Sequence, residues 1–204
     1  MKYKENYQKR KSLTRLENNR KLRRFLIVCE GEKTEPNYFR KFPENPEVYD
    51  RIDIYGTGYN TISLVNEAIR LKLEAQKRKE PYIEVWCVFD KDDFPIDQFI
   101  NAIILAGKNQ IKCAYSIEAF EIWYMLHFNF YDTALSRSQY KEKLSELLGK
   151  TYQKNDEGMY QFLKKRKNIA MQNARKLYIL QHNRAFTEQN PITTVFKLVE
   201  RLLP

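Results

Sequence analysis

Cysteines and long apolar runs are scarce in this chain of 204 residues, and their scarcity narrows the range of functions. The three cysteines, Cys29, Cys87 and Cys113, lie far apart and show neither disulfide pairing nor zinc-ligand spacing. We therefore expect reduced core thiols and no structural zinc. No run is long and apolar enough to span a membrane, and residues 1–7 lack the apolar core of a secretion signal. These features predict a cytoplasmic protein without membrane contact.

A nucleotide-binding loop is also missing. The loop Gly56-Thr57-Gly58 lacks the Gly-Lys-Ser/Thr ending of a P-loop, so ATP binding by this chain is not expected. The residues that are present argue for a folded protein, because 43% are hydrophobic and 14% are aromatic. The length allows one large domain, or one domain with a small addition.

The net charge of +10 is unevenly distributed along the chain. Residues 1–24 contain ten Lys or Arg and two Glu, and residues 160–184 contain seven Lys or Arg and no acid. The rest of the chain therefore carries a net charge of −5. Two basic segments beside an acidic body suit a polyanion that lies across a cation-binding centre. The alternative is that these segments only keep the protein soluble.

Strand-like and helix-like segments alternate through the first 128 residues, which predicts βαβ units and a mainly parallel sheet. We expect strands at 24–29, 51–55, 82–89 and 110–115. We expect helices at 34–42 (capped by Thr34), 62–79, 95–106, 118–127, 137–148, 158–181 and 191–203. The predicted fold class is α/β, with a Rossmann-like sheet flanked by helices. The predicted domains are a basic arm (1–23), an α/β core (24–130) and a helical C-terminal region packed on that core (131–204).

Carboxylates follow the predicted central strand. Residues 82–89 are apolar apart from Glu84, and Asp90, Asp92 and Asp93 come directly after them. Because side chains alternate along extended backbone, Asp90 and Asp92 point the same way there. Such a pair is a common way to hold Mg²⁺ at the carboxyl edge of a sheet. The alternative is a solvated acidic turn before the next helix.

A third carboxylate, Glu30, follows the first predicted strand. It is sixty residues from Asp90 in the sequence, but adjacent parallel strands bring their carboxyl ends together. Packing several carboxylates together is costly without a cation. The sequence therefore predicts a site for Mg²⁺ or Mn²⁺ formed by Glu30, Asp90 and Asp92.

A glutamate on one strand end and an Asp-x-Asp on another resembles the arrangement of a Toprim domain. The segment at 28–39 is similar to the signature sequence of RloB-like proteins; it reads Val-Cys-Glu-Gly-Glu-Lys-Thr-Glu-Pro-Asn-Tyr-Phe. Further similarities are Phe-Asp-Lys-Asp-Asp-Phe at 89–94, Phe-Glu-Ile-Trp-Tyr-Met-Leu-His-Phe at 120–128, Tyr-Gln-Lys at 152–154, and Asn-Pro-Ile-Thr-Thr-Val at 190–195. The resemblance spans residues of about 24 to 204, in the order of the family.

One segment departs from the family pattern. The family usually has Ser-Asn-Pro before Phe-Glu, whereas this chain has Ser116-Ile-Glu-Ala before Phe120-Glu121. The serine and Glu121 persist, and Glu118 is added. On a helix, Glu118 and Glu121 would share a face.

The resemblance implies a Toprim fold and a metal-dependent enzyme of bacterial restriction or phage-defence loci, encoded beside an ATPase or restriction subunits. Asp90 and Asp92 would hold the metal, and Glu30 would complete its shell or act as general acid–base. Glu121 and Ser116 are candidates for a second metal site, with a surface ion pair as the alternative for Glu121. His127 is expected in the core.

Candidate nucleic-acid contacts come from lysine, arginine and tyrosine side chains. Lys33 lies at a predicted helix N-terminus, where phosphate binds readily. The other candidates are Tyr152, Lys154, Arg166 and Arg175.

The function expected from this sequence is a nuclease that hydrolyses DNA or RNA with Mg²⁺ or Mn²⁺ and acts with a partner in defence. The alternative is a Toprim module that binds nucleic acid or a partner protein without cutting. Another alternative, a receiver or haloacid-dehalogenase-like phosphotransferase, fits less well. The haloacid-dehalogenase-like domain has its Asp-x-Asp after the first strand, followed by Thr or Val, whereas here the motif comes later and is followed by Asp-Phe. The choice of DNA or RNA and the oligomeric state, a homo-oligomer included, are left open.

Overall fold

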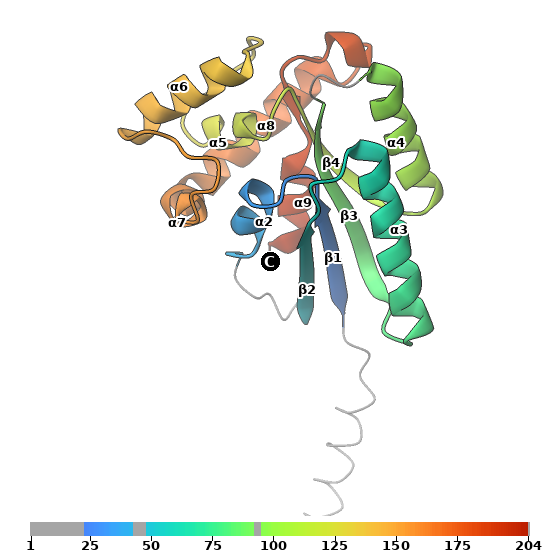
Figure 1. The fold of residues 1–204 in the computed structure, drawn as a ribbon. Coiled ribbons are helices and arrows are strands. Elements are labelled where there is room, and N and C mark those ends of the chain that lie inside the picture. Colours follow the sequence, from blue (N-terminus) through green and yellow to red (C-terminus); the bar gives the residue numbers. More distant parts are fainter. Residues whose placement is uncertain (1–22, 43–47, 92–94, 204) are drawn as a thin grey trace, which may run out of the picture.

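Five strands form one sheet in a computed structural model that describes residues 23–42, 48–91 and 95–203 (Figure 1). Their order is β2-β1-β3-β4-β5. The first four pair in parallel, and β5 is antiparallel to β4. The strands are β1 (Arg24–Cys29), β2 (Arg51–Gly56), β3 (Tyr82–Lys91), β4 (Lys112–Ile117) and β5 (Ile192–Thr193). The predicted α/β class with a mainly parallel Rossmann-like sheet is therefore confirmed.

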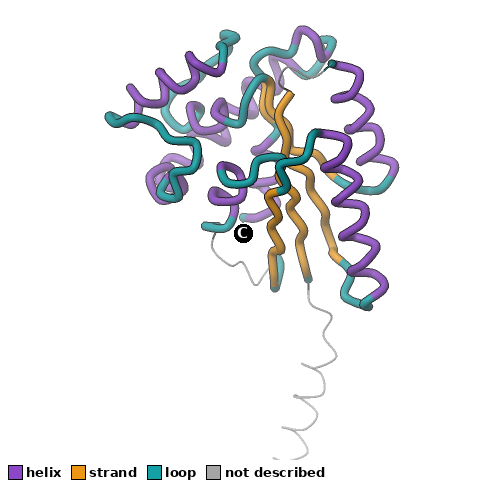
Figure 2. Tube along the Cα trace, viewed as in Figure 1, coloured by secondary structure: helices purple, strands orange, loops and turns teal. Residues whose placement is uncertain are grey.

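Helices cover both faces of the sheet (Figures 1 and 2). They are α2 (Thr34–Phe39), α3 (Thr61–Lys77), α4 (Ile96–Lys108), α5 (Glu121–Met125), α6 (Arg137–Leu148), α7 (Met159–Leu163), α8 (Lys167–Gln181) and α9 (Val195–Leu202), with short 3₁₀ turns η1 (Lys164–Arg166) and η2 (Phe186–Glu188). Helices α3 and α4 lie on one face. The others pack on the opposite face or extend beyond it.

The alternation of side chains along the strands creates two apolar cores. In β1, Leu26 and Val28 face α3 and α4, whereas Phe25, Ile27 and Cys29 face the other helices. Strands that are apolar on both faces are typical of a parallel sheet covered on both sides. This explains why the strand segments read as short continuous apolar runs in the sequence.

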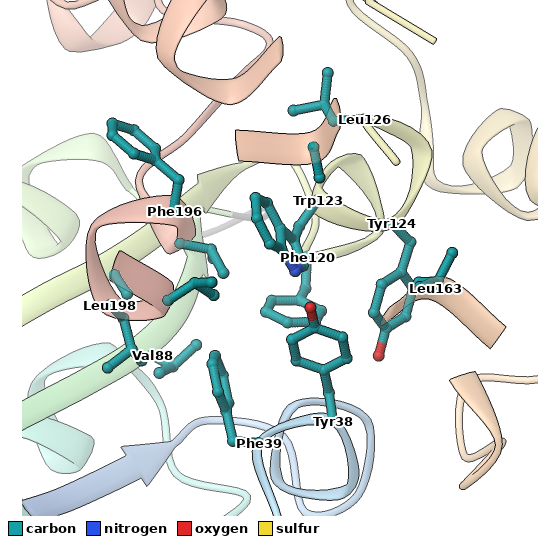
Figure 3. Close-up of a cluster of buried hydrophobic side chains, with 14 of the residues drawn as sticks. Tyr38, Phe39, Val88, Phe120, Trp123, Tyr124, Leu126, Leu163, Phe196 and Leu198 are labelled. Atoms are coloured by element: carbon teal, nitrogen blue, oxygen red, sulfur yellow. The ribbon is translucent and has the colours of Figure 1, made fainter. Parts of the chain in front are cut away.

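The larger core joins α2 and α5 to the C-terminal helices, as Figure 3 shows. Tyr38 of α2 makes ring contacts with Phe120 and Tyr124, at centroid distances of 6.0 and 5.6 Å. His127 is fully buried in this core, and its Nδ1 is 2.9 Å from the carbonyl oxygen of Trp123. The expectation of a core histidine is confirmed. These contacts fix the two helices that flank the strand ends carrying the candidate site.

Several predicted helices have other bounds in the structure, and the helix predicted at 34–42 ends at Phe39. The predicted helix at 158–181 is divided by the 3₁₀ turn η1, which no glycine or proline marks in the sequence. The last helix begins at Val195 rather than 191, because Ile192–Thr193 pair with β4 as the unpredicted strand β5. The helix after β4 begins at Glu121 rather than Glu118.

Among the described residues, no helix has the length and apolar character needed to cross a lipid bilayer. The three cysteines are free, and Cys29 and Cys87 are buried.

Candidate functional site

Glu30 and Asp90 meet at the carboxyl edge of the sheet. Because β1 and β3 are paired in parallel, Cys29 lies opposite Val88, and the N–H of Glu30 donates to the Val88 carbonyl oxygen at 2.9 Å. Glu30 Oε2 in turn accepts the N–H of Asp90 at 3.0 Å. The structure therefore brings together two carboxylates that are sixty residues apart.

The Gly56–Gly58 loop supports the backbone that carries Glu30. The N–H of Gly58 donates to the Glu30 carbonyl oxygen at 2.8 Å, and Thr57 donates to the carbonyl oxygen of Cys29. A Cβ at Gly56 would lie 2.7 Å from the Glu32 carbonyl oxygen, so the two backbones approach closely there. The role of this loop in the described structure is therefore to position Glu30.

Glu121 joins the site from the start of α5. The N–H of the preceding residue, Phe120, donates to Asp90 Oδ2 at 3.1 Å and fixes the helix start against β3. Glu121 is buried, and its Oε1 accepts the hydroxyl of Tyr152 at 3.1 Å and lies 3.8 Å from Lys154 Nζ. Glu118 precedes the helix and contacts the Asn190 side chain instead. The expectation that Glu118 and Glu121 share a helical face is therefore wrong.

A fourth carboxylate, Glu35, was not identified from the sequence as a site residue. It lies in the first turn of α2 and is 5% exposed, and its Oε2 has no hydrogen-bond partner within the described structure. A Cβ at Gly31 would lie 2.1 Å from that oxygen, so only glycine leaves room for the carboxylate there. The sequence signal is the pair of a glycine directly after Glu30 and a glutamate four residues beyond it.

Burial and neighbouring acids raise the pKa values of two of these carboxylates, Asp90 and Glu35. Burial, followed by the charges of Glu35 and Glu121, raises the pKa of Asp90 well above its usual range. Burial, followed by the charges of Glu121 and Glu30, raises the pKa of Glu35 to about 7. Such shifts mark a region where negative charge is concentrated and water is partly excluded.

An open pocket of about 480 Å³ contains these carboxylates, and we call it the carboxylate pocket. It is lined by Glu30, Gly31, Glu32, Lys33, Thr34, Glu35, Asp90, Phe120, Glu121, Arg137, Lys154 and Asn155. Lys33, Arg137 and Lys154 are exposed at its rim. The predicted N-cap, Thr34, is instead the first residue of α2, and its hydroxyl donates to the Lys154 carbonyl oxygen. Acids inside a pocket and cations at its rim form a suitable arrangement for a metal ion and a phosphate.

A preassembled metal centre is not present within residues 23–42, 48–91 and 95–203, where no three His, Cys, Asp or Glu side chains are arranged to hold an ion. Glu30, Asp90 and Glu121 instead accept hydrogen bonds from nearby N–H or O–H groups. The donor set nevertheless fits a hard cation, because it consists of oxygens alone and includes the unpartnered buried Oε2 of Glu35.

The outcome differs among Asp92, Ser116 and Tyr152, the other predicted site residues near the strand ends. Asp92 lies outside the described residues, so its place in the site stays a prediction. Ser116 is buried and contacts the Thr193 hydroxyl at 3.1 Å, so its hydroxyl is directed at β5 rather than at Glu121. Tyr152, a predicted nucleic-acid contact, is only 2% exposed, so its ring is not accessible to a nucleic acid in this structure. Its hydroxyl instead positions Glu121.

Two predicted cationic contacts lie outside the carboxylate pocket. Arg166 in η1 is exposed, with its guanidinium 4.8 Å from the centre of the Phe128 ring. Arg175 in α8 is paired with Glu200 at 2.7 Å. Lys33 and Lys154, in contrast, line the pocket itself.

Comparison with known proteins gave one match. A family model described as RloB-like protein matches residues 25–202. Comparisons with curated proteins and with solved structures gave no match. The matched range includes the sheet from the second residue of β1 onward and the carboxylates Glu30, Glu35, Asp90 and Glu121 of the pocket.

Proposed function

Because this chain belongs to the RloB-like family, and because Glu30, Glu35, Asp90 and Glu121 line one pocket, we propose that it is a metal-dependent nuclease. The observation that carries the proposal is the gathering of four carboxylates, two of them buried, in one pocket at the carboxyl edge of a parallel sheet. This edge is where α/β proteins of this topology bind their ligands. In this proposal the domain is of the Toprim type, as the sequence resemblance implies.

The energetic cost of placing these carboxylates close together supports the proposal that a cation binds among them. A buried carboxylate without a partner is destabilising, and nearby negative charges increase that cost. In Glu35 one carboxylate oxygen, Oε2, is buried with no hydrogen-bond partner in the described structure. Asp90 lies beside three other acids. A bound Mg²⁺ or Mn²⁺ would offset this cost and would polarise a phosphodiester and activate water for its hydrolysis.

The proposed roles follow from where each side chain lies. Glu35, Asp90 and Glu121 would hold the ion, together with Asp92, whose placement is not described. Glu30 is half-buried and next to Asp90, so it is placed either to complete the ligand set or to accept a proton from water.

The exposed cations at the rim would orient the substrate. Lys33 and Lys154 line the same pocket as the carboxylates, so a phosphate held between them would lie above the acids. The first residues of α2 are in contact with the segment that contains Lys154, through the Thr34 hydroxyl. This contact keeps the two sides of the rim at a fixed separation.

The experiment is a cleavage assay with single- and double-stranded DNA and RNA, in Mn²⁺, in Mg²⁺ and in EDTA. Asp90→Asn and Glu30→Gln should each reduce metal-dependent cleavage by about 10²-fold or more. Glu142→Gln is the matched control, because Glu142 is an exposed acid of α6 outside the pocket. Cleavage that persists in EDTA, or that is equal in the parent and the two site variants, would refute the proposed mechanism.

The second candidate function, binding without cleavage, is favoured by the basic segment at 160–184. In the structure this segment forms α7, η1 and α8, and Lys164, Lys165 and Arg166 are exposed on it. A binding module predicts salt-dependent affinity for nucleic acid and no cleavage products under any metal condition.

We further propose that the protein acts in bacterial defence with an ATPase or restriction-system partner. The support is the family resemblance together with the absence of a P-loop from the sequence. Under this proposal, the partner supplies sensing and energy. Cleavage that requires both the partner and ATP, and that is lost with Asp90→Asn, is the expected result.

A further inference from the structure

A second pocket of about 470 Å³ lies beside the carboxylate pocket, and we call it the flanking pocket. It is formed by the start of α6 and by residues 152–155. Glu121, Arg137, Lys154 and Asn155 line both pockets. A ligand that occupies the carboxylate pocket can therefore continue directly into the flanking pocket.

The walls of the flanking pocket are held by several hydrogen bonds. The start of α6 has a capping box between Ser136 and Gln139. The N–H of Tyr152 donates to Ser145 Oγ of the same helix at 2.9 Å. On the other side, the Thr34 hydroxyl donates to the Lys154 carbonyl oxygen. The pocket is thus a preformed feature of the fold rather than a gap between independent segments.

The charges around the flanking pocket favour an anion. Arg137, Lys141 and Lys154 line it, and Glu121 is the acidic residue among its described lining residues. The Glu121 carboxylate already accepts the Tyr152 hydroxyl. The pocket also lies at the N-terminal end of α6, where the helix dipole favours negative charge. Lys141 belongs to the flanking pocket and does not line the carboxylate pocket.

We propose that the flanking pocket binds the nucleotide next to the scissile phosphate, and that the substrate is therefore single-stranded or locally unpaired nucleic acid. This inference rests on the proposed nuclease function. Lys141 would bind the neighbouring phosphate, while the base and sugar occupy the space between α6 and residues 152–155. The chemistry is common to DNA and RNA, so the experiment includes both.

The size of the flanking pocket indicates that its ligand is an unpaired strand. Its volume lies within the range of about 300–1,000 Å³ that is typical of small-molecule sites. It can hold one nucleotide unit but not a duplex, whose bases remain stacked inside. Enzymes that enclose a nucleotide in a pocket bind single strands or extrude the nucleotide from the duplex.

The test measures binding without cleavage, by fluorescence anisotropy on the Asp90→Asn background. The probes are single-stranded DNA and RNA oligonucleotides of one mixed sequence, the corresponding duplexes, and free AMP as competitor. Lys141→Glu removes the proposed phosphate contact. Lys77→Glu is the matched control, because it makes the same charge change at an exposed lysine of α3 on the opposite face of the sheet.

We expect single strands to bind more tightly than duplexes, and Lys141→Glu to weaken single-strand binding about tenfold or more. Loss of one phosphate contact should also reduce the slope of log affinity against log salt by about 0.7. Lys77→Glu should change the affinity less than twofold. An oligonucleotide that contains 4-thiouridine or 4-thiothymidine should crosslink to residues 137–155, as mapped by mass spectrometry.

Three results would overturn the inference: duplex binding at least as tight as single-strand binding, equal effects of Lys141→Glu and Lys77→Glu, or crosslinks confined to other segments. Binding of free AMP without binding of oligonucleotides would also overturn it. The two proposals fail separately. Binding and crosslinking without any cleavage products would refute the nuclease function alone, whereas cleavage unaffected by Lys141→Glu would refute the flanking pocket alone.

Discussion

Replacement of Glu35 by glutamine should stabilise the metal-free protein at alkaline pH much more than at acidic pH. Glu35 is 5% exposed, and its pKa rises from 4.5 to about 7 in the folded protein. Between these two values the unfolded chain ionises while the folded protein keeps the proton, so stability falls as pH rises. Below pH 4.5 both states are protonated, and above pH 7 the loss is complete.

The size of this effect follows from the shift. A difference of 2.5 between the two pKa values corresponds to a destabilisation of about 3 kcal/mol at pH 8, but only about 1 kcal/mol at pH 5. Because glutamine does not titrate, the stability of Glu35→Gln relative to the parent should increase by about 2 kcal/mol between these pH values. In a domain of this size, that change corresponds to a shift in Tm of roughly 4–8 °C.

Urea unfolding of both proteins at pH 5 and pH 8, in EDTA, measures this difference. Glu142→Gln removes an exposed carboxylate from α6 and should show no such pH dependence. Addition of Mn²⁺ at pH 8 should reduce the advantage of Glu35→Gln, because the cation offsets the charge that the variant lacks. A stability difference between Glu35→Gln and the parent that is the same at both pH values would refute the placement of Glu35 as a buried, charge-repelled carboxylate.

Two further substitutions distinguish residues needed for cleavage from residues needed only for the stability of the fold. Gly31→Ala places a Cβ 2.1 Å from the present position of Glu35 Oε2, so the carboxylate must move. Cleavage should therefore fall by about 10²-fold, while the circular dichroism spectrum remains that of the parent. Cleavage at the parental rate would contradict this. Asp53→Ala leaves the buried guanidinium of Arg24 without its main partner at the opposite end of the strands, and urea unfolding should show a loss of about 3–5 kcal/mol. Cleavage per folded molecule should not change in Asp53→Ala. A loss of stability below about 1 kcal/mol would show that the Arg24–Asp53 ion pair contributes little to the free energy of unfolding.

The adjacency of Glu30 and Asp90 could be predicted because it depends on local patterns. Each residue follows a short apolar run, and the helix-like segments between the runs require parallel strands. In a parallel sheet, the ends of neighbouring strands lie at one edge whatever the details of side-chain packing. The prediction therefore needed only strand order, and β1 and β3 are neighbours.

The parts that could not be predicted depend on tertiary contacts without a local pattern. Tyr152 is a candidate nucleic-acid contact in the sequence, but it is buried in the core that α5 and α6 form together. Strand β5 has only two residues and exists because Ile192–Thr193 reach the edge of β4. Glu35 occupies a helical first turn, where an acid is ordinarily explained by the helix dipole. Its burial depends on Gly31 and on the fold of the whole β1–α2 segment.

Glu35 also bears on the choice between the two candidate functions. A protein that only binds polyanions is stabilised by cations at its surface and weakened by acids beneath the bound phosphate. Lys33 and Lys154 would serve such a protein equally well if Glu30, Glu35, Asp90 and Glu121 were neutral. The fold would then avoid the cost of burying Glu35 Oε2 without a hydrogen-bond partner. A cation bound among the acids would offset this energetic cost, because it would neutralise the cluster and attract the phosphate. The hypothesis of a metal-dependent nuclease therefore explains both the carboxylates and the surrounding lysines, whereas the hypothesis of binding without cleavage explains the lysines alone.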